Sequence, residues 1–339
     1  MKKLRLGLIG LGGQGRAHAN VLLSAPEDFP CELVAVCDID PKKFEKQNFN
    51  FNLKEGQGTM GFDSMPCYTD FHEMIAREHL DMVSVVVPTY LHCEITVDCL
   101  KAGLHVLCEK PMALDTDECD KMIATAKECG KILMVGQCLR FWNEYIILKS
   151  MIDSGEYGKV LAGMFWRGGD TPSWSYQNWM LHKELGGGAI FDQHIHDVDM
   201  VQYLFGIPES VSSSAAIVHP GSNYESVCTN YIYPNGPVIF THNDWTLSYV
   251  FAHGFRVNFE KATLEMANGK LMLYVRGGET KEITFVREPA LRAETRYLAE
   301  CVLGQHDNVI DPPFSARESV RIVKAEIASA DKHAEPVKL

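Results

Sequence analysis

The stretch LRLGLIGLGGQG, residues 4–15, decides the fold of the N-terminal part of the chain. A strand-like apolar run over residues 4–9 leads into the pattern Gly10-x-Gly12-x-x-Gly15, which includes Gly13 and Gln14, and a helical stretch follows over residues 13–24. The first two glycines permit a tight turn and close approach of a pyrophosphate, and the helix N-terminus offers it unpaired N–H groups. The pattern therefore predicts a dinucleotide site, with a flexible glycine-rich loop as the alternative.

A single carboxylate distinguishes NAD from NADP as the expected cofactor. Asp38 follows a second apolar run, residues 33–37, near the ~20-residue spacing from Gly15 that is typical of this motif. A carboxylate at the end of that strand can accept hydrogen bonds from the adenosine ribose hydroxyls, and it would repel the extra phosphate of NADP. No arginine follows immediately, so the sequence predicts NAD. The alternative is a plain turn residue at a strand end.

The first ~135 residues alternate strand and helix patterns, which is typical of a parallel sheet with crossover helices. Continuously apolar runs are expected for strands that are covered on both faces. We expect a doubly wound α/β domain with a helix beginning near Pro41 and an irregular insertion over residues 49–65. The expected strands are residues 4–9, 33–37, 82–87, 104–108 and 132–135, with a short one near 67–68.

The pattern changes after Gln137. We expect helices over residues 145–154, 188–205, 291–303 and 315–331, a strand over 159–167, and further strands with turns at 234–237 and 268–269. This order predicts an α/β domain with a large, mostly antiparallel open sheet and helices on one side. The predicted domains are an NAD-binding domain, residues 1–136, and a substrate-binding and oligomerisation domain, residues 137–339, whose last helix is a candidate to pack back on the first domain.

Composition excludes several classes of protein. The 339-residue length favours two domains, and a net charge of −12 argues against a nucleic-acid partner. No apolar run approaches the ~20 residues of a membrane span, and the N-terminus lacks the features of a secretory signal. The eleven cysteines include no CxxC pair, so we expect buried free thiols and a cytoplasmic protein.

Ligands of open α/β sheets bind beyond the carboxyl ends of the strands, and two segments of this sequence lie there. They are Pro88-Thr89-Tyr90-Leu91-His92 and Glu109-Lys110-Pro111. The Lys110 ammonium group could hydrogen-bond a substrate hydroxyl and stabilise an alkoxide as hydride leaves. The alternative is that Lys110 is a solvated lysine in a loop.

These motifs, together with Gly186-Gly187-Gly188-x-x-x-Asp192-x-x-x-His196-Asp197, resemble the glucose–fructose oxidoreductase/inositol dehydrogenase/rhizopine-catabolism family. The resemblance covers nearly the whole chain and is specific for the family rather than for a substrate. It implies that an open C-terminal sheet mediates assembly into a homo-oligomer, a dimer or tetramer. It also implies that Lys110 positions the reacting hydroxyl, that Asp192 binds substrate and that His196 is the general base. Positions implied or expected to line the cofactor pocket are Pro88, Thr89, His92, Glu109, Lys110 and Gln137.

Asp192 and His196 lie four residues apart in a predicted helix, hence on one face. A histidine base suits proton removal from a secondary alcohol near neutral pH. The alternative is a core histidine bonded to a backbone carbonyl. His194, together with Asp192, His196 and Asp197, could also form a metal-binding cluster. Residues two apart on a helix point to different sides, however, so no metal is predicted. If this segment were extended instead of helical, His194 and His196 would share a face, and a metal site would remain an alternative.

Aromatic and polar groups gather around the predicted start of the second domain. Aromatic faces together with carboxylate and imidazole partners suit a sugar ring or a cyclitol. The alternative for each aromatic residue is a core or interface position, and Arg140 could instead pair with an anionic substituent or the cofactor phosphates. Besides Asp192 and His196, the candidate substrate-binding residues are Arg140, Trp142, Trp166, Trp174, Trp179 and His182.

The sequence therefore predicts an NAD-dependent enzyme that oxidises a secondary hydroxyl of a sugar, glycoside or inositol. One alternative is a redox-neutral enzyme that keeps NAD bound and cleaves, eliminates or epimerises through a transient keto-sugar. The other is a non-catalytic NAD sensor, which has no need of Lys110, Asp192 and His196 together.

Overall fold

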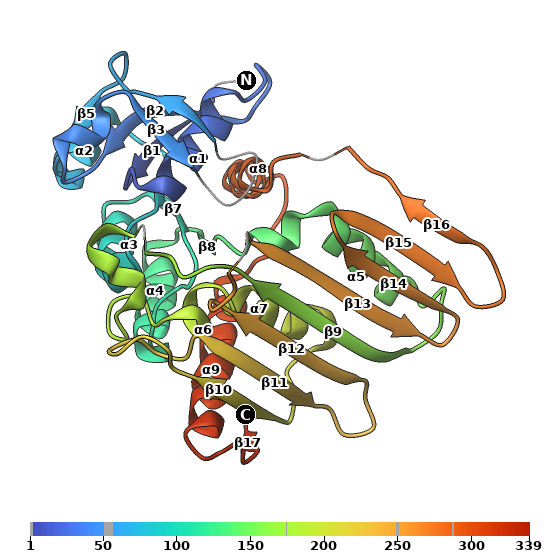
Figure 1. The fold of residues 1–339 in the computed structure, drawn as a ribbon. Helices are drawn as coiled ribbons and strands as arrows, with labels where there is room; N and C mark the ends of the chain where they lie inside the picture. The colour runs from blue at the N-terminus through green and yellow to red at the C-terminus, as the bar shows by residue number, and fades with distance from the viewer. Residues whose placement is uncertain (1–2, 51–56, 174, 249–250, 287) are drawn as a thin grey trace. The chain divides into compact units, whose positions relative to one another are not determined.

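The structure is a computed structural model that describes residues 3–50, 57–173, 175–248, 251–286 and 288–339, so the candidate Trp174 lies outside the described residues. The chain forms two compact units (Figure 1). Unit 1 contains residues 1–138 and 288–316, and unit 2 contains residues 139–287 and 317–339. The sequence-derived domains instead gave residues 288–316 to the second domain. The assignment of a cofactor role and a substrate role to the two domains stays a prediction.

Unit 1 is built on a six-stranded sheet of order β5-β2-β1-β6-β7-β8, in which every neighbouring pair is parallel. The strand order reverses between β1 and β6, and ligands of open α/β sheets bind at the carboxyl ends beside such a switch. The strands are β1 (Leu4–Ile9), β2 (Cys31–Cys37), β5 (Cys67–Tyr68), β6 (Met82–Val85), β7 (His105–Cys108) and β8 (Leu133–Val135).

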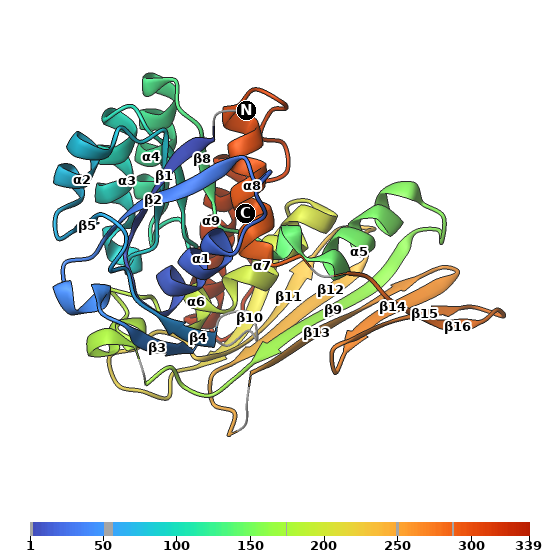
Figure 2. The same cartoon turned by 90° about the horizontal axis from the view of Figure 1, so that it is seen from above.

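Helices cover both faces of this sheet. On one face α3 packs beside α4, and on the other α1 packs beside α8 (Figure 2). The doubly wound parallel fold expected from the sequence is therefore confirmed, and all four residues of β6 are buried as its apolar run predicts. The helices are α1 (Gly13–Leu23), α2 (Phe71–Glu78), α3 (His92–Lys101), α4 (Thr116–Cys129) and α8 (Ala290–Val302).

Two local expectations in unit 1 were wrong. The helix expected near Pro41 is only a 3-10 turn, Pro41–Phe44, and the segment expected to be irregular takes part in an antiparallel pair, β3 (Gln47–Asn50) with β4 (Gln57–Met60). The buried Arg16 guanidinium donates hydrogen bonds to the carbonyls of Lys43 and Met60. A buried charge needs such acceptors, so contacts that are distant in sequence shape this segment.

Unit 2 is built on a nine-stranded sheet of order β16-β15-β14-β13-β9-β12-β11-β10-β17. Among the described strands of this sheet only the β9–β12 pair is parallel, which confirms the mostly antiparallel sheet. Asn268 and Gly269 both have positive φ and join β14 to β15, as the hairpin signal predicts. The strands are β9 (Val160–Gly168), β10 (Ser210–Ala216), β11 (Ser226–Ile232), β12 (Val238–Asp244), β13 (Ala252–Phe259), β14 (Ala262–Ala267), β15 (Lys270–Val275), β16 (Thr280–Ile283) and β17 (Val337–Lys338).

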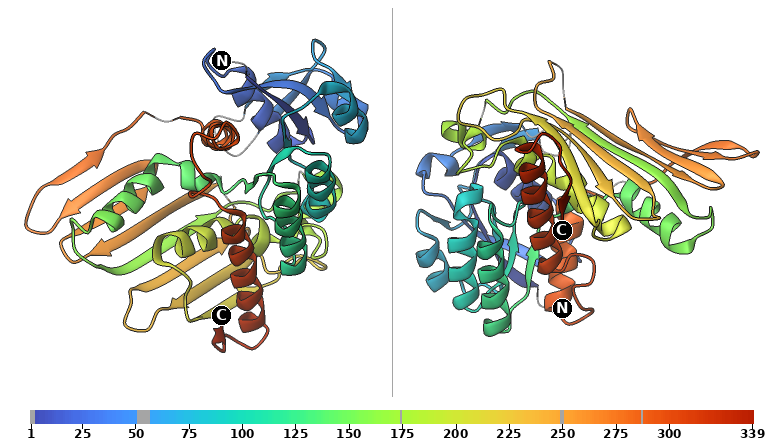
Figure 3. Two further views of the ribbon diagram at one scale, coloured as in Figure 1. Left: turned by 180° about the vertical axis from the view of Figure 1, so that it is seen from behind. Right: turned by 90° about the horizontal axis from the view of Figure 1, so that it is seen from below.

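Helices of unit 2 lie on one face of the sheet (Figure 3). Along β9 the side chains alternate, because successive residues of a strand point to opposite faces. Phe165 contacts Phe205 of a helix, and Arg167 pairs with Asp197 of the same helix. The helices are α5 (Asn143–Ser154), α6 (Ala189–Asp192), α7 (Ile195–Phe205) and α9 (Pro313–Ala330).

Helix α9 spans 18 residues and carries buried polar groups toward the sheet. Tyr231 donates a hydrogen bond to Glu326 at 2.8 Å, and the Ser213 N–H donates to the Ser329 hydroxyl at 2.9 Å. Among the described helices, this one included, none combines the length and the apolar character that a membrane span requires.

The cysteines are unpaired thiols, and most of them are buried, although Cys228 is exposed. Burial raises the pKa of Cys37 to about 12 and that of Cys99 to about 12, so these thiols are protonated at neutral pH. The cysteines therefore act mainly as small apolar side chains.

Candidate active site

The three glycines of the turn in unit 1 serve different purposes. Gly10 has φ +97°, and a Cβ there would lie 2.1 Å from the carbonyl oxygen of Val86, beside the switch between β1 and β6. A Cβ on Gly15 would lie 2.0 Å from the carbonyl oxygen of Gly10. A Cβ on Gly12 would meet no atom within 4 Å. Chain packing thus requires the outer two glycines, whereas Gly12 leaves a ligand room to approach the backbone.

The N-terminus of α1 is suited to an anion. Gly12 is its N-cap, no side chain caps it, and no acidic residue lies in its first turn. The first N–H groups of a helix lack intrahelical partners and carry a partial positive charge. Gly13 and Gln14 begin this helix, so their backbone is placed where the phosphates of a dinucleotide would bind.

Asp38 lies beside the glycine turn, at the end of β2. Its carboxylate accepts hydrogen bonds from the backbone N–H of Leu11 at 2.7 Å and of Asp40 at 3.0 Å. A carboxylate has about four acceptor sites, so these bonds orient the group and leave sites for ribose hydroxyls. The turn, the helix terminus and Asp38 together fit an NAD molecule.

Asp38→Asn is expected to weaken NADH binding by roughly 10- to 100-fold, because hydrogen bonds to a charged group contribute about 1.5–3 kcal/mol. The preference for NADH over NADPH should fall at the same time, since the variant lacks the charge that repels the extra phosphate. Titration of cofactor fluorescence measures both affinities without a substrate. Asp40→Asn, two residues away, is the control, and equal NADH affinity in wild type and Asp38→Asn would contradict the role of Asp38.

The segment after β6 is tied to the lysine turn. The ring nitrogens of His92 lie 2.8 Å from the carbonyl oxygens of Pro111 and Val87. Burial lowers the pKa of His92, and Thr89 is buried beside it in a short turn that begins after Pro88. His92 therefore joins the two strand-end segments, and direct contact of these residues with the cofactor stays a prediction.

The lysine turn is held by Glu109. Its Oε1 accepts hydrogen bonds at 2.7 Å from Nε2 of His18 and at 2.7 Å from Nε2 of Gln14, and its Oε2 accepts from the Lys110 N–H at 3.1 Å. Burial by itself raises the pKa of Glu109, but the His18 and Gln14 bonds and the Lys110 charge outweigh it, so the net pKa is lowered. Glu109 is therefore an ionised anchor that links the turn before the half-buried Lys110 to helix α1.

Gln137 follows β8 and is buried, and no described group hydrogen-bonds its side-chain amide. A buried amide without partners is costly. The carboxamide of a nicotinamide offers the matching donor and acceptor, so this residue also fits an NAD-binding domain.

Asp192 and His196 belong to unit 2, where their exposure sets them apart. From Ala189 to Gln202, a stretch that the structure describes without a gap, every residue is buried except these two, which are half-buried. The side chains proposed for chemistry are thus the ones that a ligand can reach. Lys110 belongs to unit 1 and is described within that unit.

The helix that carries them is not continuous, so the single helix expected over residues 188–205 was wrong in this respect. Helix α6 ends at Asp192 and α7 begins at Ile195. The His194 N–H bonds to the carbonyl of Ala189, five residues back, at 2.8 Å. Such a wide turn is frequent at functional sites and changes the angle between positions four apart. The argument that Asp192 and His196 share one face of a continuous helix therefore does not hold. Both side chains are nevertheless half-buried in an otherwise buried stretch.

Packing explains the three glycines before α6. A Cβ on Gly186 would lie 2.6 Å from Cα of Met180, and one on Gly187 would lie 2.7 Å from Cβ of Phe191. Gly188 is the N-cap of α6 and has φ +72°. The turn is a closely packed start for the helix rather than a flexible loop.

His194 faces the core of unit 2. Its Nε2 lies 3.0 Å from Oε2 of Glu326, and both side chains are fully buried. Asp197 pairs with Arg167, also buried, at 3.2 Å. These two residues therefore lie in the interior beside the partners named, whereas Asp192 and His196 are half-buried, and the expectation that no metal binds here stays a prediction.

Arg140 is paired inside unit 2. Its guanidinium donates to both oxygens of Asp199, at 2.8 and 2.6 Å, and lies over the ring of Tyr203. Both charged side chains are only 1% exposed. A buried charge that is already neutralised favours a structural role, and substrate binding by Arg140 stays a prediction.

The aromatic candidates that the structure describes are spread over different parts of unit 2. Trp166 alternates with Phe165 and Arg167 on β9, so it lies on the sheet face opposite to α7. Trp142 contacts the ring of His253 edge-on at 5.1 Å. Trp179 packs against the buried cluster of Met180, Ala189 and Trp245, whereas His182 is exposed. Of these residues, Trp179 and His182 lie nearest in sequence to α6, and their contact with substrate stays a prediction.

Family models match most of the chain. Residues 4–137 match the model described as "Oxidoreductase family, NAD-binding Rossmann fold", and residues 145–265 match the "GFO/IDH/MocA C-terminal domain". The chain belongs to the GFO/IDH/MocA oxidoreductase family. The resemblance seen in the sequence is thereby confirmed, and NAD is the cofactor of this family member's Rossmann domain.

Curated relatives of this GFO/IDH/MocA protein have different activities. It is 35% identical over 46% of its length to a 2,7-anhydro-N-acetylneuraminate hydratase of Mediterraneibacter gnavus, covering 42% of that protein. It is 31% identical over 60% of its length to a myo-inositol 2-dehydrogenase of Thermotoga maritima, covering 55% of that protein. The chain thus spans about half the length of the curated relatives that it matches. The fold is that of an aldose-aldose oxidoreductase of Caulobacter crescentus, with TM-score 0.84, 22% identity and full coverage of both chains.

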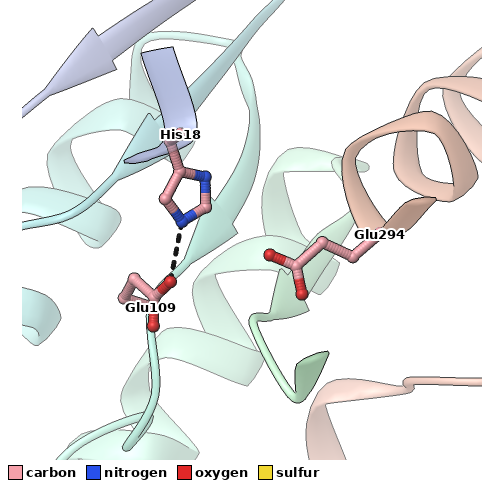
Figure 4. Close-up of side chains that lie close together, drawn as sticks. All are labelled: His18, Glu109 and Glu294. Atoms are coloured by element: carbon pink, nitrogen blue, oxygen red, sulfur yellow. Dashed lines mark hydrogen bonds and ion pairs between the residues drawn. The ribbon is translucent and has the colours of Figure 1, made fainter. Parts of the chain in front are cut away.

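Sequence reasoning missed two buried members of the site in unit 1, His18 and Glu294 (Figure 4). A signal existed for each of them. His18 lies on the buried side of α1 between Ala17 and Ala19, and Glu294 lies on the apolar side of α8 with Leu291 and Leu298. A charged or titratable residue on an apolar helix face is costly unless it is paired or neutral, so each position indicates a buried partner.

Proposed function

We propose that this family member is an NAD-dependent dehydrogenase that oxidises a secondary hydroxyl of a sugar, glycoside or inositol. The observation that carries the proposal is the selective exposure of Asp192 and His196 in an otherwise buried helical stretch. Membership of a family with an NAD-binding Rossmann domain supports NAD as the hydride acceptor in this reaction. The substrate class is supported by relatives named for inositol dehydrogenation.

Each residue has a separate task in this proposal. His196 accepts the hydroxyl proton as general base, and Asp192 orients the substrate or the imidazole. The ammonium group of Lys110 donates a hydrogen bond to the reacting oxygen and stabilises negative charge that develops on it. NAD, when bound, supplies the acceptor for the hydride. Glu109 holds the lysine turn through the Lys110 N–H.

A redox-neutral reaction is the second candidate, because two of the curated relatives are hydratases rather than dehydrogenases. Such an enzyme would use the same base and lysine to form a transient keto-sugar, and it would return the hydride before releasing product. It would convert its substrate with no net change in NADH.

A panel of sugars, glycosides and inositols tests the two candidates. We expect the wild type with NAD to accumulate NADH at 340 nm with at least one of these compounds, in equal amount to the oxidised product. Product formation by chromatography without NADH would favour the redox-neutral candidate. Conversion of no compound by either measure would contradict both, and Lys110→Met is the control for background reduction.

A further inference from the structure

Three titratable side chains meet in the interior of unit 1. His18 comes from α1, Glu109 follows β7, and Glu294 comes from α8, about 185 residues further along the chain. One ring nitrogen of His18 and one carboxylate oxygen of each glutamate lie within 4.8 Å of one another, and all three residues are buried (Figure 4). Buried polar groups of this kind are costly unless they satisfy one another.

Glu109 and Glu294 have unequal surroundings. Glu109 accepts hydrogen bonds from His18, Gln14 and the Lys110 N–H. No described group forms a hydrogen bond with either carboxyl oxygen of Glu294, although its side chain points toward the other two (Figure 4). When two buried carboxyl groups are this close, one keeps its proton. The donors select Glu109 as the ionised partner and leave Glu294 as the neutral one.

The charges around Glu294 act in the same direction. It faces His18 from α1, Glu109 from the end of β7, and the buried Asp311 from the segment that follows α8. Burial, together with the negative charges of Glu109 and Asp311, raises the pKa of Glu294 well above its ordinary value. A neutral carboxyl group can donate one hydrogen bond, which an ionised one cannot.

We propose that Glu294 is a positioning residue, a neutral carboxyl group that lies beside His18 and Glu109 without repelling the Glu109 carboxylate and so keeps in place the turn that carries Lys110. The inference rests on the proposed function of Lys110. Glu109 is the link, since its Oε1 is bonded to α1 while its Oε2 holds the Lys110 N–H. Ionisation of Glu294 would set two negative charges side by side and displace Glu109 from these bonds.

A proton accounts for this cluster better than a metal ion. Both oxygens of Glu109 already accept N–H groups, and Nε2 of His18 points at one of them. A metal ion that used Oε1 of Glu109 or Nε2 of His18 would have to displace these donors. If a stoichiometric metal ion copurifies with the protein, and its chelation abolishes the effects described below, the proposal is overturned.

The test compares Glu294→Ala with Glu294→Gln, which keeps the shape and hydrogen bonding of a neutral carboxyl group. We expect Ala to lower kcat by about 10- to 100-fold, the size typical of a small misplacement of a catalytic group, and Gln to restore most of the rate. The matched control is Glu300→Gln on the same helix, where the carboxylate is 31% exposed beside His306. An equal loss of kcat in Glu294→Ala and Glu294→Gln, or no loss of kcat in either variant, overturns the proposal.

The pH dependence separates positioning from simple packing. A group whose pKa is raised on folding destabilises the folded state as the pH rises from its ordinary value through the raised one. The wild type should therefore lose stability and kcat toward alkaline pH, and Glu294→Gln should lose less of both because glutamine has no proton to release. If stability and kcat of the wild type and of Glu294→Gln fall in parallel toward alkaline pH, the proposal that Glu294 is neutral is overturned.

A readout of Lys110 itself keeps the result separate from the proposed function. Reductive methylation with ¹³C gives each lysine an NMR signal, and Lys110→Arg assigns that of Lys110. The signal should move in Glu294→Ala and return in Glu294→Gln. If the signal behaves so but no panel compound is converted, the proposed function fails and the positioning role stands. If compounds are converted but the signal moves in neither variant, the positioning role fails alone.

Discussion

Lys110→Met is expected to lower kcat by about 100- to 1,000-fold, the usual cost of removing one donor to a developing oxyanion. Methionine has a similar length and no charge, so it removes the ammonium group with little change in packing. The Glu109 bond is to the Lys110 backbone N–H, which the variant keeps, so the turn should stay in place. NADH affinity should be nearly unchanged. Stopped assays with the best panel substrate, and fluorescence titration of NADH, measure the two quantities.

The control for Lys110 is Lys101→Met, an exposed lysine in the last turn of α3. It should retain wild-type rate and stability. Wild-type turnover in Lys110→Met would remove this residue from the mechanism. A large loss of NADH affinity would instead assign Lys110 to cofactor binding alone.

His196→Ala is expected to lower kcat by about 100- to 10,000-fold, the usual contribution of a general base. The wild type should lose rate as the pH falls, because a protonated imidazole cannot accept the substrate proton. The variant should lack this acid limb. Because His196 is half-buried while its neighbours are buried, the folded state should be little affected.

His242→Ala, an exposed position on β12, is the matched control in unit 2. A variant at His196 that keeps both the wild-type rate and the acid limb would leave the base unassigned. A large drop in thermal stability would identify His196 as a core residue, the alternative that the sequence left open. Thermal melts at one pH, run on both variants, separate these outcomes.

The sequence predicted much of the fold because the relevant patterns are local. Continuous apolar runs identified the parallel strands, and Asn268-Gly269 identified a hairpin through the backbone angles that it allows. The same local reasoning failed at Pro41, where a proline suited to a first helical turn begins only a 3-10 turn. There the outcome depends on the buried Arg16 and on chain that is distant in sequence.

Side-chain pairing was beyond the sequence for the same reason. Arg140 was a candidate for binding an anionic group, but it pairs with Asp199 inside unit 2. Trp166 was grouped with a pocket wall, but strand alternation places it on the face opposite to α7. The partner of Arg140 lies 59 residues away, and the contact that places α7 on one face of β9 joins residues 30 apart, so local periodicity alone identifies neither.

What the sequence determined by itself is the glycine turn, Asp38 and the lysine turn, since each is a short motif whose chemistry depends on neighbouring residues and on strand ends. Only the tertiary structure decided which buried charges meet. Glu294 reaches His18 and Glu109 because α8 returns to unit 1 and packs beside α1. The physical reason is that a buried carboxyl group takes its charge state from its surroundings, and those surroundings exist only once the chain has folded.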